Sequence, residues 1–489
     1  MTKKALIIGS GIAGLASALR LRKKGYDVTV FEANDYVGGK LSSIENSGYR
    51  WDAGPSLFTM PHFVDELFEL FNLDPRDHFN YLRKEVVCNY FWDDQSRFSV
   101  HADKEHFIEA ASIFFNTPAQ KIKNYLKSSK DKYDLTAHLF LEKSLHKWST
   151  YLSRDTLLSL AQSYKLDVSQ TLNGLNKKTF NDPRLVQLFD RYATYNGSSP
   201  YKTPGIMSII PHLEMHYGTF LPEGGMHSIT QSLFDLARNQ GIEFRLSEPV
   251  KRVVHKNGMA VGIESAQGRY HSDIVVSNMD IFSTYHKLLE NSPRPERILK
   301  QERSSSALIF YWGIQKSFPE LDLHNIFFSG NYKKEFEHIF DLKTVYEDPT
   351  VYINITSKDE TGDAPDGCEN WFVMINTPGN FEQDWESIKT HARKNIIAKL
   401  NKALGTDLDA LIETEEILEP RTIESKTSSH RGSLYGASSN SKFAAFLRHA
   451  NFSGKIKNLY FCGGSVHPGG GIPLCLLSAK IVSDLIPKV

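Results

Sequence analysis

A glycine-rich turn at the start of the chain constrains the fold more than any other feature. The stretch from Lys3 to Glu32 reads KKALIIGSGIAGLASALRLRKKGYDVTVFE and predicts a strand, a tight turn, a helix and a second strand. Gly9 would turn the chain sharply, Gly11 would admit a pyrophosphate to the backbone, and Gly14 would let the helix pack against the strand. Backbone amide groups at the start of the helix would face the negative charge of the pyrophosphate. Glu32 would accept hydrogen bonds from the ribose hydroxyls. The stretch therefore predicts a dinucleotide site.

A second glycine pair distinguishes between the two common dinucleotides. Gly38, Gly39 and Lys40 come shortly after Glu32, the residue expected to bind the ribose. The sequence DAGPS at 52–56 follows another short extended segment. This continuation resembles the extended signature of FAD enzymes of the glutathione reductase and amine oxidase type. We therefore predict FAD rather than NAD as the cofactor.

The C-terminal stretch NLYFCGGSVHPGGGIPLCLLSAKIVSDLI predicts the other wall of the same site. Leu459 to Cys462 is expected to be a buried strand, and a helix should begin near Ile472, with Pro473 suited to its first turn. Five glycines from 463 to 471 would let backbone amides approach the flavin from the opposite side. An ordinary strand-to-helix turn does not require so many glycines, so we expect a closed FAD site.

Charge and cysteine usage narrow the class of protein. Lys plus Arg and Asp plus Glu are both 57, so the chain has no overall basic charge and we predict no nucleic-acid partner. The four cysteines lack metal-ligand spacing, which predicts free thiols in a reducing compartment and no bound metal. The first strand begins too early for a signal peptide, and no apolar run approaches the roughly 20 residues of a membrane helix. We expect a cytoplasmic protein whose membrane contact is peripheral.

The segments between the motifs predict a discontinuous α/β fold. It would combine a Rossmann-type FAD domain with a mixed-sheet substrate domain and a helical hood. Short runs at Ala307–Ile314, Thr350–Ser357 and Asn370–Pro378 are rich in β-branched and aromatic residues, so we expect them to be strands of one substrate sheet. We assign the FAD domain to residues 1–78, 218–281 and 456–489, the substrate domain to a hairpin at 79–105 and to 205–217 and 282–455, and the hood to 106–204.

One segment of the hood has two interpretations. Residues 135–152, LTAHLFLEKSLHKWSTYL, place Leu141, Leu145, Trp148 and Leu152 at helical spacing, with lysines on the far side. Such a basic amphipathic helix lies either on a membrane surface or, as is more common, against the core of its own protein.

Taken together, the motifs resemble those of carotenoid desaturases of the bacterial phytoene desaturase type over nearly the whole chain. The resemblance is carried by GSGIAGLASALRLRKKGYDVTVFEAN, GGK, DAGPS, RYATYNGSSPYKTP at 191–204, PEGGM, VVSNMD and CGGSVHPGGGIPLCLLSAK. Within that family the chain is most similar overall to the flavobacterial branch of hydroxycarotenoid 3,4-desaturases, which act on a 1'-hydroxy-gamma-carotene-like substrate.

The resemblance implies a set of cofactor contacts. Matching positions are Gly9, Gly11, Gly14, Glu32, Gly38, Gly39, Lys40, Gly54, Val250, Gly463, Gly464 and Ile472. Neighbouring residues complete the predicted site: Ser10, Ile12, Ala13, Ala33, Pro55, Ser56 and Gly471. Lys40 stands where many relatives have Arg, and a lysine cannot reproduce the bidentate fork of an arginine in a phosphate contact. No catalytic residue is assigned; His467, in the terminal glycine loop, is expected to be structural.

The resemblance also implies a reaction. A hydride would pass to FAD from an allylic carbon of a hydroxylated carotenoid, a proton would leave the neighbouring carbon, and the electrons would go on to oxygen or a quinone. Aromatic residues of 191–201 and 307–314 are candidate walls of the substrate tunnel. Four alternatives remain open: a phytoene-type desaturase, a carotenoid isomerase, another FAD enzyme such as an amine oxidase, and a relative of GDP-dissociation inhibitors without flavin chemistry. Glu32 and the terminal glycine loop argue against the last.

Overall fold

The computed structural model describes residues 2–137, 141, 143–147, 150, 166–290, 292–441 and 447–489. Eight of the 18 residues of the predicted amphipathic segment at 135–152, including Trp148 and Leu152, lie outside these residues. Of that segment's apolar stripe, Leu141 and Leu145 are described; Leu145 is buried and Leu141 is half-buried. Among the described helices, none combines the length and the apolar character needed to cross a membrane.

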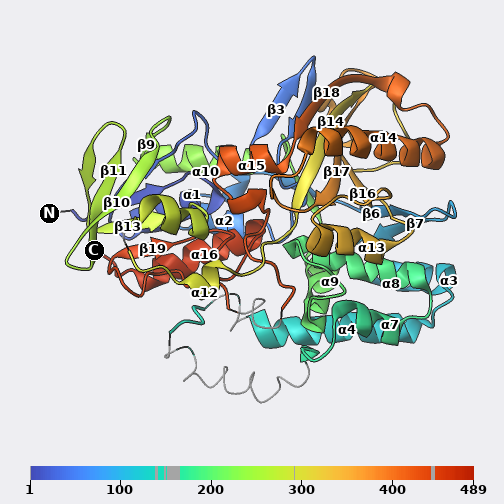
Figure 1. The fold of residues 1–489 in the computed structure, drawn as a ribbon, viewed down its shortest axis with the longest axis horizontal. Coiled ribbons are helices and arrows are strands. Elements are labelled where there is room, and N and C mark those ends of the chain that lie inside the picture. The colour runs from blue at the N-terminus through green and yellow to red at the C-terminus, as the bar shows by residue number, and fades with distance from the viewer. Residues whose placement is uncertain are drawn as a thin grey trace.

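The strands of the predicted N-terminal unit lie in the interior of a parallel five-stranded sheet whose strand order is β19-β13-β1-β2-β9. The glycine turn connects β1 to α1, as predicted, and all four strand pairings are parallel. Strands from three distant parts of the sequence therefore meet in one sheet: β1 (Lys4–Ile8), β2 (Asp27–Phe31), β9 (Glu243–Arg245), β13 (Ile274–Ser277) and β19 (Leu459–Phe461). Both termini lie at this end of the molecule (Figure 1).

Two hydrophobic cores enclose this sheet because its strands are apolar on both faces. One core joins it to the helices α1 (Ile12–Lys23), α2 (His62–Glu69), α10 (His227–Asn239) and α16 (Ile472–Leu485). The opposite core includes side chains of the small antiparallel sheet formed by β10 (Val250–Lys256), β11 (Met259–Ser265) and β12 (Arg269–His271). The α1 helix contacts α16 and α10, so the first and last motifs of the chain are neighbours.

A seven-stranded mixed sheet, in the order β18-β14-β17-β16-β15-β6-β7, forms the second unit. The three predicted runs are adjacent in it, and the predicted hairpin supplies its last two strands. The strands are β6 (Val86–Phe91), β7 (Arg97–His101), β14 (Ser306–Ile314), β15 (His324–Phe327), β16 (Val351–Ile355), β17 (Glu369–Thr377) and β18 (Ile412–Leu418). The beginning of the predicted hairpin differs: β5 (Tyr81–Arg83) pairs instead with β8 (Phe220–Pro222), outside this sheet.

Strand alternation gives the two faces of this sheet different roles. One face packs under α14 (Trp385–Leu404), with Phe310, Val373 and Ile353 among the buried residues of that core. The other face carries Ile309, Met374, Tyr352 and His324, which line a cavity. The cavity is therefore bounded on one side by a rigid sheet.

The remaining described helices and strands complete the molecule. Helices below the second sheet in Figure 1 are α3 (Lys104–Phe114), α4 (Ala119–Thr136), α7 (Leu172–Thr179), α8 (Pro183–Asp190) and α9 (Ile210–His212). Elsewhere lie β3 (Ser43–Asn46), β4 (Tyr49–Asp52), α11 (Ile281–Ser283), α12 (Glu296–Leu299), α13 (Tyr332–Glu337) and α15 (Pro420–Thr427). The helical character predicted for 106–199 is confirmed where the chain is described.

Candidate active site

A continuous cavity of about 1050 Å³ connects the two units. At one end it is lined by the carboxyl ends of β1 and β2 and by the terminal glycine loop, and at the other by the face of the seven-stranded sheet. Cavities at the carboxyl ends of parallel strands are the usual nucleotide sites of α/β folds. The volume lies at the upper end of the range for small-molecule sites, which leaves room for a long substrate beside a cofactor.

The nucleotide end holds a buried carboxylate in a fixed orientation. Glu32 Oε2 accepts hydrogen bonds from the backbone N–H and the hydroxyl of Ser10, both at 2.8 Å. Its Oε1 accepts from the backbone N–H of Asn34 at 2.9 Å and from the Asn34 amide at 3.0 Å. Each carboxylate oxygen can accept further bonds, so Glu32 remains able to receive ribose hydroxyls.

Two helix N-termini face the cavity without side-chain caps. The N-cap of α1 is Gly11 and that of α16 is Gly471, and neither offers a side-chain acceptor to the free N–H groups of its first turn. Ile12 and Ala13 of α1 and Ile472 of α16 line the cavity. Unsatisfied N–H groups at helix starts attract anions, so this pair of helices fits a ligand that carries phosphate.

The glycines leave space that side chains would fill. A Cβ at Gly11 would lie 2.7 Å from the side-chain oxygen of Asn278, and Gly9 has a φ of +92°, which side-chain-bearing residues rarely adopt. Gly471, at a φ of +103°, has no atom within 4 Å of where its Cβ would stand. The residues present thus fit a dinucleotide whose pyrophosphate approaches the backbone closely.

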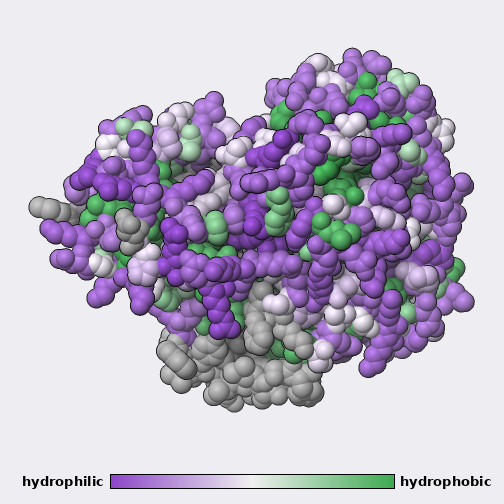
Figure 2. Space-filling model, in the orientation of Figure 1, coloured by the Kyte–Doolittle hydropathy of each residue, from purple (hydrophilic) through white to green (hydrophobic). Residues whose placement is uncertain are grey.

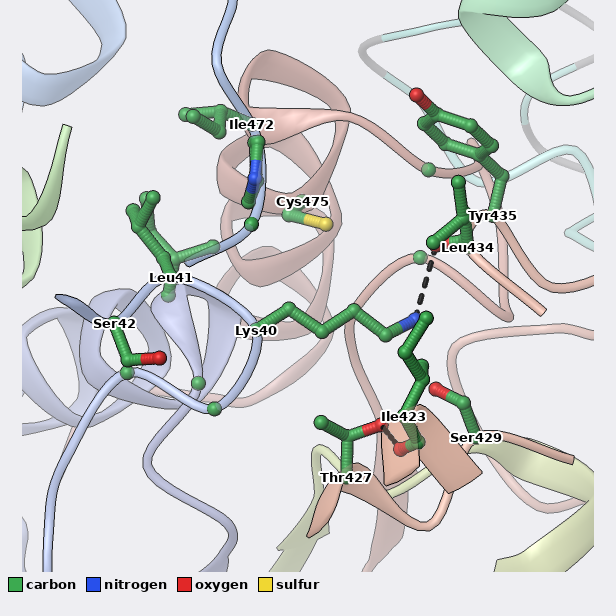
Figure 3. Close-up of a pocket in the computed structure, with 18 of the residues that line it drawn as sticks. Lys40, Leu41, Ser42, Ile423, Thr427, Ser429, Leu434, Tyr435, Ile472 and Cys475 are labelled. Carbon is green, nitrogen blue, oxygen red and sulfur yellow. Dashed lines mark hydrogen bonds between the residues drawn. The ribbon is translucent and has the colours of Figure 1, made fainter. Parts of the chain in front are cut away.

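Lys40 connects the nucleotide unit to a distant loop. Its ammonium donates to the carbonyls of Ser433 at 2.9 Å and Leu434 at 3.0 Å, and Figure 3 shows the side chain extending across the cavity toward Leu434. Burial lowers the pKa of Lys40 to about 8. Because this pKa lies above neutral pH, the side chain is mostly protonated there and keeps a positive charge near the cavity.

At the sheet end, a chain of hydrogen bonds runs from the glycine-rich segment to the sheet. The Ser56 hydroxyl lies 2.9 Å from the hydroxyl of Tyr352, which lies 2.8 Å from Nδ1 of His324. All three residues line the cavity. Burial, followed by the nearby charges of Lys84 and Arg191, lowers the pKa of His324 to about 3, so the imidazole is neutral.

A buried ion pair forms another wall at this end. Arg191 donates to both carboxylate oxygens of Glu214, at 2.9 and 3.1 Å. Glu214 also accepts from the hydroxyl of Tyr192 at 2.6 Å and from that of Tyr195. Arg191, Glu214 and Tyr195 line the cavity, whereas Tyr192 lies behind them. The pair places a compensated charge in the wall of the cavity.

The structure brings nearly all of the predicted cofactor residues to the cavity. Its lining includes Gly9, Gly11, Ile12, Ala13, Glu32, Ala33, Gly38, Gly39, Lys40, Gly54, Pro55, Ser56, Val250, Gly463, Gly464, Gly471 and Ile472. Ser10 is not part of the lining, because its side chain turns to Glu32. Gly14 is also absent from it: a Cβ there would lie 2.1 Å from the carbonyl of Gly9, so this glycine serves the close packing of helix and strand.

Other sequence-predicted residues have mixed positions. Tyr195 reaches the cavity, but of the 307–314 strand only Ile309 does so; Phe310 and Trp312 pack in the core beneath α14. His467 is buried outside the lining, and its Nε2 lies 2.9 Å from the carbonyl of Lys143. The polar residues of the sheet end, His324 above all, were not singled out from sequence, because the runs in which they occur carry no chemical motif.

Comparison with known proteins identifies the class. The sequence profile described as flavin containing amine oxidoreductase matches residues 12–487. The chain therefore belongs to the flavin containing amine oxidoreductase family, and it is a flavin-dependent oxidoreductase.

Individual relatives show which members of this family the chain resembles. The chain is 60% identical to a 1-hydroxycarotenoid 3,4-desaturase of Flavobacterium sp. over 99% of both sequences. It is 31% identical to a phytoene desaturase of Fusarium fujikuroi, over 99% of this chain and 89% of that protein. A 4,4'-diapolycopene oxygenase of Methylomonas sp is 32% identical, over 99% of this chain and 98% of that protein. The resemblance to carotenoid desaturases inferred from the motifs is thereby confirmed.

Solved structures confirm the predicted fold class. An oxidoreductase from Methanosarcina mazei superposes with a TM-score of 0.67 at 16% identity, over 98% of this chain and 100% of that one. Cyclohexylamine oxidase from Brevibacterium oxydans gives a TM-score of 0.64 at 16% identity, over 99% and 98%. At these identities the likeness concerns the architecture alone.

Proposed function

We propose that this chain is an FAD-dependent hydroxycarotenoid desaturase that removes two hydrogens from C-3 and C-4 of a 1-hydroxylated carotenoid. The observation that carries this proposal is the 60% identity, over the full length, to a 1-hydroxycarotenoid 3,4-desaturase. A cavity that continues from the nucleotide end to a sheet face carrying Ile309, Ile326 and Met374 supports it. The finer choice of FAD over other flavins is supported by Glu32, which is oriented to receive ribose hydroxyls, and by the two uncapped helix N-termini.

Different groups of residues would hold different parts of the cofactor. Glu32 and Val250 would hold the adenosine, and the first turn of α1 would hold the pyrophosphate. Residues Gly54 to Ser56 and the loop from Gly463 to Ile472 would enclose the flavin ring. When bound, the flavin supplies a hydride acceptor for a C–H bond.

The chain itself would position the substrate and exclude water from it. Ile309, Ile326 and Met374 form an apolar wall on the rigid sheet, against which a polyene can lie extended. Holding a reacting bond in one place replaces random encounter by a fixed geometry, which is a major source of rate enhancement. The Arg191–Glu214 pair lines this end with two opposite charges that compensate each other, so that neither faces an apolar ligand as an unpaired ion.

The experiment that tests this function is product analysis. Purified protein with bound FAD is supplied with a 1-hydroxylated carotenoid, and the product is expected to be lighter by two hydrogens and to absorb at longer wavelength. Substrate isomerised without loss of hydrogen would instead indicate a carotenoid isomerase, and phytoene consumed in preference would indicate a phytoene-type desaturase. A protein that takes up no FAD on reconstitution would favour a non-catalytic relative.

Turnover also needs an electron acceptor and access to the substrate, and both are proposals. We infer that oxygen or a quinone accepts the electrons, which oxygen consumption in the presence and absence of a quinone would separate. We also propose peripheral membrane contact, because long carotenoids dissolve in bilayers. Polar residues cover most of the visible coloured surface in Figure 2, so such contact would be local. Liposome flotation tests it: protein that stays in the soluble fraction, even with carotenoid present, would contradict it.

A further inference from the structure

Tyr435 brings an unpartnered hydroxyl to the cavity. The residue lines the cavity and is half-buried. Its hydroxyl makes no hydrogen bond to any described residue, but it keeps accessible surface, whereas the unpartnered hydroxyls of Tyr90 and Tyr311 are closed off. Burial raises the pKa of Tyr435 to about 12, a shift that a phenol at the outer surface would not show. The accessible surface of this side chain therefore faces the interior cavity.

Hydrogen bonds hold the backbone of Tyr435 at both ends. Its N–H donates to Oγ of Ser304 at 3.0 Å, and its carbonyl accepts from the guanidinium of Arg448 at 2.8 Å. The same guanidinium nitrogen donates to the carbonyl of Gly464 at 3.3 Å. Arg448 thus fixes Tyr435 relative to the terminal glycine loop, which we expect to enclose the flavin ring.

Two glycines make room for the aromatic ring. A Cβ at Gly197 would lie 2.9 Å from Cδ2 of Tyr435, and a Cβ at Gly470 would lie 2.8 Å from its Cδ1. Figure 3 shows the ring extending from one side of its loop, while Lys40 approaches Leu434 from the other side. The phenol is therefore held in one position while its hydroxyl stays free, as a preorganised recognition group requires.

The surroundings of the hydroxyl define the ligand that it suits. Leu434 and Met374 pack against the same apolar cluster that contains Ile309, and all three residues line the cavity. The phenol of Tyr435 stays protonated at neutral pH, so it is uncharged and can both donate and accept a hydrogen bond. Such a group suits an uncharged oxygen, because a cation holds a carboxylate or phosphate more strongly. The combination fits a hydrocarbon that carries a hydroxyl.

We propose that the hydroxyl of Tyr435 forms a hydrogen bond with the hydroxyl of the carotenoid and thereby selects hydroxylated over unhydroxylated substrates. This inference rests on the proposed function and names a specificity determinant for it. In a 1-hydroxylated carotenoid, a single carbon, C-2, lies between the hydroxylated carbon and the bond from C-3 to C-4. The group that recognises the hydroxyl must therefore stand beside the flavin, and the contact with Gly470 places Tyr435 next to the flavin loop.

The test compares two substrates in matched variants. Wild-type holoenzyme, Tyr435→Phe and Tyr311→Phe are assayed with a 1-hydroxylated carotenoid and with the same carotenoid lacking the hydroxyl. Tyr435→Phe should lower kcat/KM for the hydroxylated compound by about tenfold and should not lower it for the unhydroxylated one. Tyr311→Phe is the control, because it removes an unpartnered hydroxyl that is closed off from the cavity. It is expected to leave the preference of the wild type unchanged.

A binding measurement separates recognition from chemistry. The dissociation constants of the desaturated, hydroxylated product and of its unhydroxylated analogue can be measured by quenching of tryptophan fluorescence. The wild type should prefer the hydroxylated compound, and Tyr435→Phe should lose that preference at unchanged flavin content and flavin absorption spectrum.

Three results would overturn the role of Tyr435. They are equal losses on both compounds, a preference that survives in Tyr435→Phe, and a fall in FAD affinity of that variant without substrate, which would assign the hydroxyl to the cofactor. A wild type that desaturates neither compound would instead overturn the proposed function, and the binding preference would still decide the role of Tyr435.

Discussion

Ser10 holds the side chain of Glu32 in place at the nucleotide end: the serine donates both its backbone N–H and its hydroxyl to one carboxylate oxygen, each at 2.8 Å. Twenty-two residues separate them in sequence. The contact fixes the carboxylate at the end of β2 relative to the turn that begins α1. The carboxylate that would meet the ribose is thus oriented by the turn that would meet the pyrophosphate.

This contact predicts graded effects on cofactor affinity. Glu32→Ala removes the ribose acceptor and leaves the donors of Ser10 unpaired, so we expect FAD affinity to fall by about tenfold to a hundredfold. Ser10→Ala keeps the carboxylate and its backbone bond, so the fall should be smaller. Fluorescence titration of apoprotein with FAD measures both, and equal affinity of the Glu32→Ala variant and wild type would contradict the assignment.

Close packing at Gly54 predicts a loss of stability on adding a single methyl group. A Cβ there would lie 1.8 Å from the carbonyl of Lys40, so the backbone must move, and we expect Gly54→Ala to cost at least about 1 to 3 kcal/mol of unfolding free energy. Gly362→Ala is the matched control, because no atom lies within 4 Å of its Cβ position. Urea unfolding should show the control unchanged within about 0.5 kcal/mol.

The buried ion pair predicts a large effect of removing one partner. Glu214→Ala leaves the buried Arg191 without its carboxylate, and we expect a loss of about 3 to 5 kcal/mol in stability. Glu337→Ala is the control, because its pair with Lys333 lies at the surface and contributes about 1 kcal/mol at most. Similar thermal shifts in the two variants would show that Arg191 finds other partners.

The lowered pKa of Lys40 predicts a pH dependence of apoprotein stability. Its pKa is about 8 in the folded chain and 10.5 ordinarily. Between these values the unfolded chain binds the proton and the folded chain does not, so this group makes stability rise with pH from about 8 to 10.5 and adds no slope outside that window.

The measurement compares wild type with Lys40→Met, so that the titration of other groups cancels. The stability difference, wild type minus variant, should increase from pH 8 toward 10. A difference that stays flat or falls over that interval would show that Lys40 is not buried as a cation in the folded apoprotein.

Local sequence pattern was sufficient to predict strands and helices where the residues that determine them are close together in the sequence. The strand, turn and helix of residues 4–23, and the strand and helix around the terminal glycine loop, were predicted because hydrophobic periodicity and glycine placement act over a few residues. The same holds for the sheet strands at 306–314, 351–355 and 369–377. The domain boundaries and the cofactor contacts assigned to individual residues stay predictions.

Lys40 shows where local pattern is insufficient. The sequence predicts that Lys40 lies near the cofactor. Its carbonyl partners, Ser433 and Leu434, are 393 and 394 positions away along the chain. No spacing rule connects such positions. Likewise, Tyr192 and Tyr195 belong to one segment, yet only the tertiary arrangement directs the second toward the cavity.

The sequence by itself determined the cofactor class and the architecture, since backbone turns, helix starts and strand alternation depend on neighbouring residues. The tertiary structure decided the composition of the substrate end. There Arg191, Glu214, His324 and Tyr352 come from separate segments and meet Ser56 of the glycine-rich motif, and each of these four alone is an ordinary polar residue. Their chemistry arises from burial and mutual distance: the imidazole of His324 is neutral because the fold buries it, and its Nδ1 lies 2.8 Å from the hydroxyl of Tyr352.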